Sequence, residues 1–366
     1  MEAALNADET WDAVVIGAGP AGSVTAREMA RRGARVLLVD RATFPRPKVC
    51  GCCLNRATLA ALDAVGLGHI PARCGAIPLH EVKLAAGRLH AVVPLPGGMA
   101  LSRDAFDAAL ADEAVKAGVT FRGGMSVANG RVYPGRASIT VHATGLSGNT
   151  ARPVRGSRVG AGVIVPAALA PEFFAPGTIY MATGRGGYVG LVRLEDNRLD
   201  LAAALDPAFV RSAGGPAQAA RLILKETNWP VPDALEELPW KGTPPLTRKP
   251  DAIAGPGWFA VGDAAGYVEP FTGEGMAWAV MSAAALAPIA VRAAEGWDAR
   301  FAREWTHVHH RLVGRRMRAC RWVARGLRSP LVTRFAVRAL NIAPLLSRPL
   351  VAALNRPARL PQGEFA

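Results

Sequence analysis

The feature that most constrains the fold of this chain is a glycine-rich turn that follows a short apolar segment near the N-terminus. Residues 14–16, Val-Val-Ile, predict a buried strand, and Gly17, Gly19 and Gly22 follow it with G-x-G-x-x-G spacing. Gly17 permits a tight turn, Gly19 lets a pyrophosphate approach the backbone, and Gly22 allows close packing on the sheet. A helix is expected from about Ser23 to Arg32. The spacing therefore predicts a dinucleotide-binding α/β unit whose phosphates face a helix N-terminus.

A second predicted strand, Ala34 to Val39, ends at Asp40. A carboxylate at this point can accept hydrogen bonds from the two ribose hydroxyls of a dinucleotide. Strand, helix, second strand and terminal acid follow one another in the first 40 residues. This context favours a nucleotide site over a glycine-rich turn without a ligand.

A second segment, near residue 270, distinguishes FAD from NAD. Residues 258–261 predict another buried strand, and Gly262 and Asp263 follow it directly. The Asp263 carboxylate can accept a hydrogen bond from a sugar-alcohol hydroxyl, which ribitol has and NAD lacks. A helix that starts near Met276 would point its N-terminus at the N1 and C2 side of a flavin ring and favour the reduced state. Between Asp263 and this helix, four residues belong to the predicted flavin loop: Pro270, Gly273, Glu274 and Gly275.

Length and composition bound the remaining possibilities. With 366 residues, of which 50% are hydrophobic, the chain can bury a sizeable core, and we expect two domains. The acidic first 13 residues lack an apolar stretch, and the five cysteines lack regular spacing, so we expect a cytoplasmic protein without a secretory signal. The uncharged run Met276 to Val291 is shorter than the roughly 20 residues that span a bilayer, which favours a buried helix.

The formal net charge of +14 is concentrated in the C-terminal segment, Phe301 to Ala366. Thirteen arginines, no lysine and two acids lie there, which accounts for +11 of the total. Apolar residues alternate with the arginines, so two interpretations stay open: amphipathic helices on an anionic membrane surface at the inner membrane face, or a helical cap with solvated arginines. No stacking or groove-reading module accompanies the charge, so nucleic acid is not an expected partner.

The two cofactor segments must meet in space, so the residues between them form an insertion into one nucleotide-binding domain. We predict an α/β fold in which residues 1–75, 101–150 and 245–300 form a Rossmann-type FAD-binding domain. Residues 76–100 and 151–244 form a mainly antiparallel-sheet substrate domain, and residues 301–366 form a basic helical extension. The elements predicted in this region are strands within Leu79 to Pro94, a helix from Ser102 to Gly118 with Ser102 as N-cap, and strands Arg158 to Val165, Ile179 to Ala182 and Tyr188 to Arg193.

Four segments carry a resemblance to a known family: GAGPAG at residues 17–22, FPRPKVCG at 44–51, the helix beginning near Arg103, and VGDAAGYVEPFTGEG at 261–275. Over residues 1–300 the chain resembles the geranylgeranyl reductase branch of the p-hydroxybenzoate hydroxylase superfamily. The resemblance implies that Arg103 contacts the cofactor and that Asp263 binds its ribitol and pyrophosphate region. It also implies that Pro270, Gly273 and Gly275 line the flavin ring, and that Cys50 faces the flavin and aids protonation.

Two segments depart from the pattern of that branch. Ala143-Thr144-Gly145 stands where many members have Ala-Asp-Gly, and residues 186–196 keep Tyr188 but lack the Trp and Phe-Pro of a Tyr-x-Trp-x-Phe-Pro motif. Isoprenoid specificity therefore stays open, and so does the role of Tyr188, which either donates a proton or hydrogen bond to substrate or is buried against a backbone partner.

The cluster Cys50-Gly51-Cys52-Cys53 has three interpretations: a wall of the active site, packing without chemistry, or thiol redox or metal chemistry. His307, His309 and His310 are expected on the surface, and no metal site is predicted. Glu274 either acts as a base or stands at a helix N-terminus for a structural reason.

We therefore predict an FAD-dependent oxidoreductase that delivers hydride from flavin N5 to a C=C bond of a hydrophobic, isoprenoid or polyketide-lipid-like substrate. The alternative is an FAD-dependent monooxygenase that hydroxylates an aromatic or polyketide substrate through a C4a-hydroperoxide. No second G-x-G-x-x-G follows a strand, so NAD(P)H docks transiently or a partner reductase supplies electrons. The predicted catalytic residues are Cys50 and Tyr188. The predicted cofactor-binding residues are Gly17, Gly19, Pro20, Ala21, Gly22, Asp40, Arg41, Arg103, Gly262, Asp263, Pro270, Gly273, Glu274 and Gly275.

Overall fold

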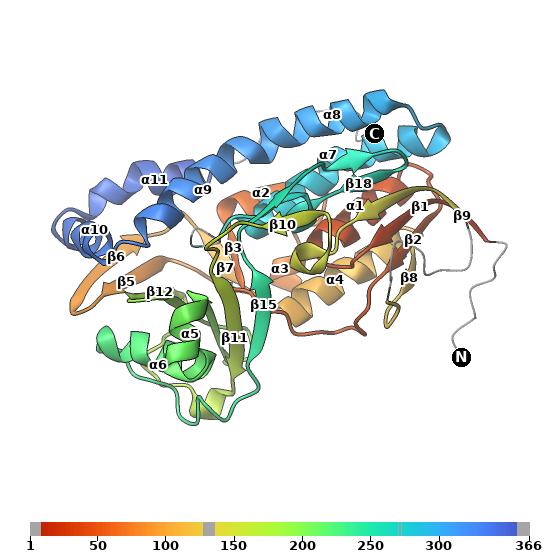
Figure 1. The fold of residues 1–366 in the computed structure, drawn as a ribbon. Coiled ribbons are helices and arrows are strands. Elements are labelled where there is room, and N and C mark those ends of the chain that lie inside the picture. The colour runs from red at the N-terminus through yellow and green to blue at the C-terminus, as the bar shows by residue number, and fades with distance from the viewer. Residues whose placement is uncertain (1–8, 127–135, 270, 272, 357–366) are drawn as a thin grey trace.

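The glycine-rich turn follows the β1 strand, Thr10–Ile16, of a six-stranded sheet (Figure 1). The computed structural model describes residues 9–126, 136–269, 271 and 273–356. Strand order in this sheet is β17-β18-β9-β1-β2-β8, and all pairs are parallel except β17 with β18. The strands beside β1 are β2 (Val36–Val39), β8 (Thr120–Arg122), β9 (Arg136–His142), β17 (Ala254–Gly255) and β18 (Trp258–Ala260).

Strands far apart in the chain therefore share this nucleotide sheet. β18 lies more than 200 residues after β1, yet only β9 separates the two strands. The carboxyl ends of β1 and β18 consequently open toward the same edge, where ligands of open parallel sheets bind. This arrangement brings the two cofactor segments together, as their motifs require.

A second sheet of seven strands holds the segments predicted as the insertion. Its order is β15-β11-β14-β13-β12-β5-β6, antiparallel except where β12 runs parallel to β5. Helices α5 (Pro207–Ala213) and α6 (Pro216–Glu226) lie near it at the lower left of Figure 1, and α6 packs on it through a core of its own. Its strands are β5 (Glu81–Ala86), β6 (Leu89–Pro94), β11 (Val159–Val165), β12 (Thr178–Gly184), β13 (Gly187–Arg193), β14 (Leu199–Leu205) and β15 (Lys241–Pro245).

Short elements connect the two sheets. β3 (Cys53–Asn55), β7 (Gly98–Ala100) and β4 (Ile77–Pro78) form a three-stranded sheet, and β10 (Ala151–Pro153) pairs with β16 (Arg248–Pro250). The helices α2 (Arg56–Ala64) and α3 (Ile70–Arg73) follow β3. The cysteine-rich segment therefore runs into the connection between the sheets.

Three helices build the core of the nucleotide half. α1 (Pro20–Ala30) packs against both α4 (Arg103–Lys116) and α7 (Gly275–Glu295). As predicted, Ser102 caps α4, because its Oγ accepts a hydrogen bond from the Ala105 amide at 3.2 Å. α7 is long and apolar enough to span a bilayer by length and composition, but 83% of its most apolar stretch is buried inside the protein. Such burial is what a core helix shows, so α7 by itself is weak evidence for a membrane span.

The C-terminal segment forms helices that run across the molecule. α8 (Ala299–His309) continues through a π-helical turn, His310–Gly314, into α9 (Arg315–Gly326), and Figure 1 shows the pair as one rod along the top. α10 (Pro330–Ile342), a 3₁₀ turn (Pro344–Ser347) and α11 (Arg348–Leu354) follow. α10 packs on β5 and β6, where Val337 and Leu340 meet Ala86 and Ala91. These helices therefore cover the outer strands of the second sheet.

One histidine is not where the sequence placed it. His309 is buried and its ring meets that of Trp305, with 5.4 Å between ring centroids. Burial lowers the pKa of His309 to about 4. The prediction of three surface histidines was wrong for His309, because it shares the inward face of α8 with Phe301 and Trp305. Among the described residues, no group of three or more His, Cys, Asp or Glu side chains could hold a metal ion.

Candidate active site

The turn after β1 has the close backbone approach that its glycines predict. A Cβ on Gly22 would lie 1.7 Å from the carbonyl oxygen of Gly17, and one on Gly17 would lie 2.4 Å from that of Ala143. Gly17 also has a φ of +103°. Only glycine fits at these two positions, so the turn brings backbone amides to the N-terminus of α1.

Asp40, at the end of β2, braces this turn. Its carboxylate accepts hydrogen bonds from the Ala18 amide at 2.8 Å and the Ala42 amide at 2.9 Å, and it pairs with Arg46 at 3.4 Å. Asp40 is buried and also lines a cavity, so its remaining acceptor sites face ligand space. The structure thus adds a bracing role to the ribose-binding role that we assign to Asp40 from sequence.

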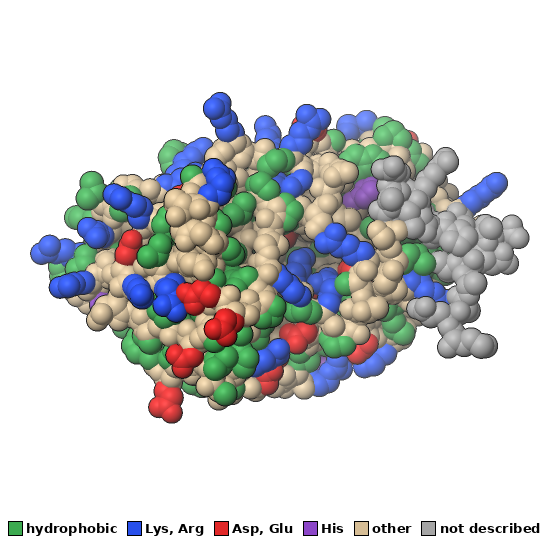
Figure 2. Space-filling model, turned by 60° about the horizontal axis from the view of Figure 1, so that its bottom comes forward, with side chains coloured by type: hydrophobic (Ala, Val, Ile, Leu, Met, Phe, Trp, Pro, Cys, Tyr) green, Lys and Arg blue, Asp and Glu red, His purple; other side chains and the backbone are tan. Residues whose placement is uncertain are grey.

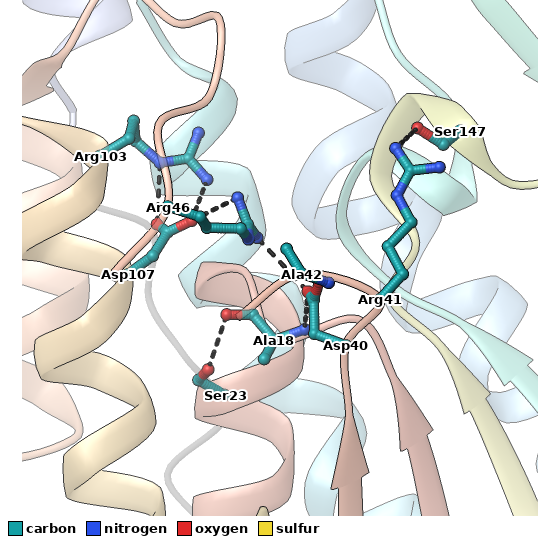
Figure 3. A network of polar contacts seen from close by, with 9 residues as sticks. All are labelled: Ala18, Ser23, Asp40, Arg41, Ala42, Arg46, Arg103, Asp107 and Ser147. Atoms are coloured by element: carbon teal, nitrogen blue, oxygen red, sulfur yellow. Dashed lines mark hydrogen bonds and ion pairs between the residues drawn. The ribbon is translucent and has the colours of Figure 1, made fainter. Parts of the chain in front are cut away.

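A buried network of charges lies beside the turn (Figure 3). Arg103 forms two hydrogen bonds with Asp107 one helical turn later, at 2.8 and 2.7 Å. Arg46 approaches the same carboxylate at 3.4 Å and links it to Asp40. A Cβ on Gly19 would lie 3.8 Å from a guanidinium nitrogen of Arg103 and 3.8 Å from one of Arg46. Two guanidinium groups and a helix N-terminus therefore surround the open space above Gly19, and this set fits a diphosphate.

Sequence analysis missed Arg46 and Asp107. The signal for Arg46 was present in the FPRPKVCG loop, where it is the only arginine. Asp107 carries the (i, i+4) spacing from Arg103 that allows a pair within one helix. Neither pattern states that the pair is buried, because burial depends on how α4 packs against α1.

A cavity of about 790 Å³ extends from this turn toward the second sheet and the C-terminal helices. Gly19, Pro20, Ala21, Arg41 and Arg103 line it at the nucleotide end. From the second cofactor segment, Asp263, Gly273 and Gly275 line the same cavity. Gly262 is buried against α1, since a Cβ there would lie 2.7 Å from that of Ala21. Predicted residues from both segments thus meet at one cavity, and Pro270 lies outside the described residues.

A second cavity of about 650 Å³ adjoins the first on the other side of the turn. Gly17, Asp40 and Thr144 line it. Arg41 and Ser147 line both cavities and are joined by a hydrogen bond of 3.2 Å between them. The two spaces therefore form one elongated site with the glycine-rich turn at its middle, which suits a two-ended dinucleotide.

Glu274 does not point into this site. Its carboxylate accepts a hydrogen bond from the Cys320 thiol at 3.1 Å and pairs with Arg316 at 3.5 Å, both on α9. Glu274 is predicted as a cofactor-binding residue of the flavin loop; its carboxylate is directed to α9, which agrees with the structural alternative for this residue. Glu274 instead joins the start of α7 to the C-terminal helices.

Cys50 lies in the cavity and is the most acidic thiol of the cluster. Hydrogen bonds from Cys52 and, to a smaller extent, the nearby charge and hydrogen bond of Arg103 lower the pKa of Cys50 to about 5. Burial raises the pKa of Cys53, and a hydrogen bond to Cys50 together with burial raises that of Cys52. Within the described residues, none of the five cysteines forms a disulfide. At neutral pH the cluster therefore presents one thiolate, at Cys50, beside a guanidinium.

Two further cavity residues, Tyr188 and Tyr267, are buried phenols. Burial raises the pKa of each well above its ordinary value, so both are neutral at physiological pH. The Oη of Tyr188 has no hydrogen-bond partner within the described part of the protein, and its ring meets Phe271 edge-on with 5.1 Å between centroids. The backbone partner considered for Tyr188 is thus not formed, and its hydroxyl is free to meet a ligand. Sequence analysis missed Tyr267, which lies beside Gly275.

Two other ionisable groups near the cavity were also missed. Lys48 lines it, and burial lowers the pKa of this lysine. Asp200 on β14 is buried beside Cys52, and burial raises its pKa well above the ordinary value. Asp200 sits in an apolar strand without any motif, so only the packing of β14 on the cysteine loop reveals it.

The residues present fit FAD. The space above Gly19 matches a diphosphate, and Thr144 Oγ1 in the second cavity and Tyr188 Oη in the first are buried polar atoms without a partner among the described residues. Buried groups of this kind are normally satisfied by a ligand or water. Asp40, Asp263 and the guanidinium pair would hold the sugar and phosphate portions, while Gly273 and Gly275 would face the ring.

Comparison with known proteins agrees with this fit. Residues 10–134 match the family model of the FAD binding domain. A menaquinone reductase of Mycobacterium tuberculosis strain H37Rv is 50% identical over 64 residues, 18% of this chain and 16% of that protein. The Mycolicibacterium smegmatis menaquinone reductase is 28% identical over 306 residues, 72% of each chain. Digeranylgeranylglycerophospholipid reductase 1 of Methanopyrus kandleri is 27% identical over 329 residues, 79% of this chain and 82% of that one.

Solved structures share the fold. A geranylgeranyl bacteriochlorophyll reductase-like protein from Thermoplasma acidophilum superposes with a TM-score of 0.71 at 19% identity and covers 91% of each chain. A flavin-dependent brominase gives a TM-score of 0.72 at 15% identity over 95% of this chain and 94% of the brominase. The predicted fold class and the resemblance to geranylgeranyl reductase-like proteins are confirmed, and the FAD binding domain confirms the predicted cofactor.

Proposed function

We propose that this chain reduces a C=C bond in a hydrophobic, polyprenyl-type substrate. It has an FAD binding domain, and reductases are among its relatives. Reduced FAD supplies a hydride when it is bound. The chain supplies the site that holds the substrate, excludes water and delivers the proton that must accompany the hydride. The names of the menaquinone and digeranylgeranylglycerophospholipid reductases, whose substrates carry polyprenyl chains, support this substrate class.

The observation that carries the proposal is the lining of the larger cavity. Beyond the nucleotide end its walls are apolar, from β5 and β6 through β12 and β13 to the C-terminal helices; Val82, Leu84, Val93, Ile179, Met181 and Leu340 are examples. An apolar chain gains free energy there by leaving water, whereas a small charged substrate does not. Four charged residues, Arg41, Lys48, Arg103 and Asp263, line the nucleotide end, where a reacting bond would meet the flavin.

Tyr188 is the proton donor that fits this geometry. Its hydroxyl is neutral, buried and without a partner among the described residues, and its ring lies 5.8 Å from the guanidinium carbon of Arg158. Arg158 is held by Glu269 at 2.9 Å. Near Tyr188, burial and the Glu269 charge raise the pKa of the phenol more than Arg158 lowers it, so Tyr188 keeps its proton until a substrate carbon takes it.

Cys50 has a different part in this proposal. The family resemblance implies that Cys50 aids protonation, but a thiol with a pKa of about 5 has already lost its proton at neutral pH. A thiolate beside Arg103 can orient that guanidinium and accept a hydrogen bond. We therefore assign proton donation to Tyr188, whose buried hydroxyl is neutral and has no partner among the described residues.

Anaerobic mixing tests the proposal. The reduced holoprotein is mixed with menaquinone or with a geranylgeranylated lipid in detergent while the flavin absorbance is followed, and the lipid is then analysed for added hydrogen. We expect flavin oxidation without oxygen and a product whose side chain is two hydrogens heavier, a gain that remains after air has returned any quinol to the quinone. Oxidation only after oxygen is admitted, with a hydroxylated product, would replace the reductase by the monooxygenase.

That monooxygenase is the second candidate. A squalene monooxygenase of Candida glabrata is 31% identical over 93 residues, 25% of this chain and 19% of that protein. The two candidates differ in what they require of Tyr188, since hydroxylation by oxygen needs no proton on a substrate carbon. For the electron donor we propose NAD(P)H that docks transiently or a partner reductase; stopped-flow reduction of the oxidised protein by NADH and NADPH distinguishes these sources.

A further inference from the structure

The C-terminal helices expose an unusual amount of apolar surface. Of the thirteen large hydrophobic side chains that are exposed in the described part of the chain, eight lie within residues 322–350. Leu331 and Phe335, one turn apart on α10, are 78% and 76% exposed. Single exposed hydrophobic residues are ordinary, but a group of eight on adjacent helices marks an interaction surface. The group, here called the α9–α11 face, comprises Trp322, Leu331, Val332, Phe335, Ile342, Leu345, Leu346 and Leu350.

Arginines surround this face, and acids are absent from its sequence. No Asp or Glu occurs between residues 305 and 356, where eleven arginines occur. Arg321, Arg325, Arg334 and Arg338 are exposed on α9 and α10, and Arg325 lies 5.3 Å from the centre of the Trp322 ring. In the view of Figure 2, most acidic side chains lie in the lower part of the molecule, while Lys and Arg side chains project along the upper and left margins.

The large cavity opens on the same face. Ala336, Ala339 and Leu340 of α10 line it from within, together with Val351 of α11. Leu346 and Leu350 also line it, although they are 63% and 48% exposed. Residues that belong both to the lining and to the surface mark the mouth of a cavity. One mouth of the cavity therefore lies among the exposed apolar side chains of the α9–α11 face.

Contacts with the body hold these helices in place. Arg316 and Cys320 of α9 bind Glu274, and Arg328 pairs with Glu269 at 3.7 Å and donates a hydrogen bond to the Gly156 carbonyl at 2.8 Å. Val337 of α10 is buried on β5 and β6. The exposed side chains of the face thus belong to a surface that is already assembled.

We propose that the α9–α11 face docks on an anionic lipid bilayer and that a lipid reaches the cavity from the bilayer through the mouth at Leu346 and Leu350. Exposed Leu and Phe side chains enter the acyl boundary, while the arginines bind anionic headgroups. The docking on the bilayer does not depend on the proposed function, whereas the route for the lipid rests on the proposed function.

Charge favours a bilayer over a second copy of this chain. A dimer through this face would place the arginines of α9 and α10 against those of its partner, and no acid in residues 305–356 could pair with them. A bilayer that contains phosphatidylglycerol offers both components that the face lacks: negative charge at the surface and hydrocarbon beneath it.

Vesicle binding tests the docking. The holoprotein is sedimented with vesicles of phosphatidylcholine, with or without phosphatidylglycerol. We expect binding to the anionic vesicles that weakens as salt rises, and a loss of about fivefold in affinity for each of R321Q, R325Q and R338Q, since one arginine near the surface contributes about 1 kcal/mol. The double variant L331D/F335D should lose at least tenfold. L222D is its matched control, because Leu222 is an exposed leucine on α6.

Tryptophan fluorescence reports which face of the protein contacts the membrane. Trp322 is the one tryptophan among those in the described residues that is mostly exposed. Phosphatidylcholine with brominated acyl chains, mixed with phosphatidylglycerol, should quench part of the tryptophan emission, and W322F should lose that quenching while it still binds. Equal binding to both vesicle types, or none, overturns the proposal. Self-association that L331D/F335D abolishes, without vesicle binding, also overturns it and assigns the face to a dimer.

The mouth is tested without turnover. Uptake of a fluorescent polyene lipid from anionic vesicles is followed in wild type, in L350W, which narrows the mouth, and in I342W, which adds the same bulk to the face away from the cavity lining. Both variants add a tryptophan to the α9–α11 face, so uptake is compared at equal amounts of vesicle-bound protein. We expect L350W to slow uptake and I342W to leave it unchanged. Equal uptake in L350W and wild type overturns the route. Because no reduction is measured, failure of the reductase proposal would leave these outcomes readable.

Discussion

The two ends of the large cavity are built on opposite principles. At the nucleotide end four charged side chains pair with one another: Arg103 with Asp107, and Arg46 with both Asp107 and Asp40. At the substrate end the walls are apolar, and the Tyr188 hydroxyl has no partner in the described part of the protein. Internal pairs hold the cofactor end rigid before any ligand binds, whereas an unpartnered group at the substrate end keeps its hydrogen bond for the reacting molecule.

The largest expected effect is at the backbone of the cofactor end. G22A would place a Cβ 1.7 Å from the carbonyl oxygen of Gly17, so the turn must move and lose its diphosphate geometry. We expect FAD affinity to fall by about a thousandfold or more, which is about 4 kcal/mol. Isothermal titration of the apoprotein with FAD measures this. G33A is the control: Gly33 has a φ of +86° but open space around it, so G33A should cost about 1–2 kcal/mol of stability and keep FAD.

The second largest effect is expected when the buried ion pair between Arg103 and Asp107 is broken. R103A leaves the fully buried Asp107 with only the longer contact to Arg46. We expect the free energy of unfolding of the apoprotein to fall by about 3–5 kcal/mol, because a buried charge loses its main partner. K116A, at the exposed end of the same helix, should change it by less than about 0.5 kcal/mol. Urea denaturation followed by circular dichroism compares the two; equal effects would contradict the contrast drawn between the cavity's ends.

Two tyrosines on adjacent strands sharpen the same comparison. Tyr188 Oη is unpartnered at the cavity, whereas Tyr180 Oη donates to the Phe173 carbonyl at 2.7 Å and accepts from the Ala175 amide at 3.0 Å. Y188F should slow anaerobic flavin oxidation by substrate about a hundredfold at unchanged stability. Y180F should keep that rate and lose about 1 kcal/mol of stability. A normal rate in Y188F would remove Tyr188 as the proton donor.

The smallest effect concerns the thiolate between the two ends. With a pKa of about 5, Cys50 should be alkylated by iodoacetamide at a constant rate at neutral pH and progressively more slowly below about pH 5. C52A should raise that pKa by about one unit, since the Cys52 hydrogen bond is its largest cause. Mass spectrometry of the alkylated peptide assigns the site. An unchanged profile in C52A would show that Cys52 does not stabilise the thiolate.

The same shift has a defined sign for stability. The folded-state pKa of Cys50 lies below the ordinary pKa of a thiol, so the thiolate stabilises the folded state. This contribution is complete above the unfolded pKa of about 8.5 and is lost as pH falls through about 5. Wild type and C50A should therefore converge in stability at acid pH and diverge toward alkaline pH.

Local motifs made the cofactor end predictable. Gly17, Gly22 and Asp40 act through backbone geometry within one strand-turn-helix unit, so their spacing in the chain is also their spacing in space. Ser102 as the cap of α4 is predictable for the same reason. Arg46 was missed because its partners, Asp40 and Asp107, come from two other elements.

Contacts between elements that are distant in the chain had no comparable signal. Glu274 lies between Gly273 and Gly275 of the predicted flavin loop, yet its carboxylate binds Arg316 and Cys320 of a helix more than 40 residues later. His309 has no sequence mark that separates it from His307 or His310, and only the packing of α8 buries it. Which face of an element is covered depends on its neighbours, and those neighbours are distant in the chain.

The sequence by itself determined the cofactor, the order of elements in the nucleotide half and the concentration of arginine in the C-terminal segment. Only the tertiary structure decided that Cys50 is acidic, that Tyr188 is unpartnered and that the cavity opens among exposed side chains of α10 and α11. The reason is physical. Backbone turns and net charge are set by consecutive residues, whereas a pKa, an unmet hydrogen bond and a cavity mouth are set by groups that only folding brings together.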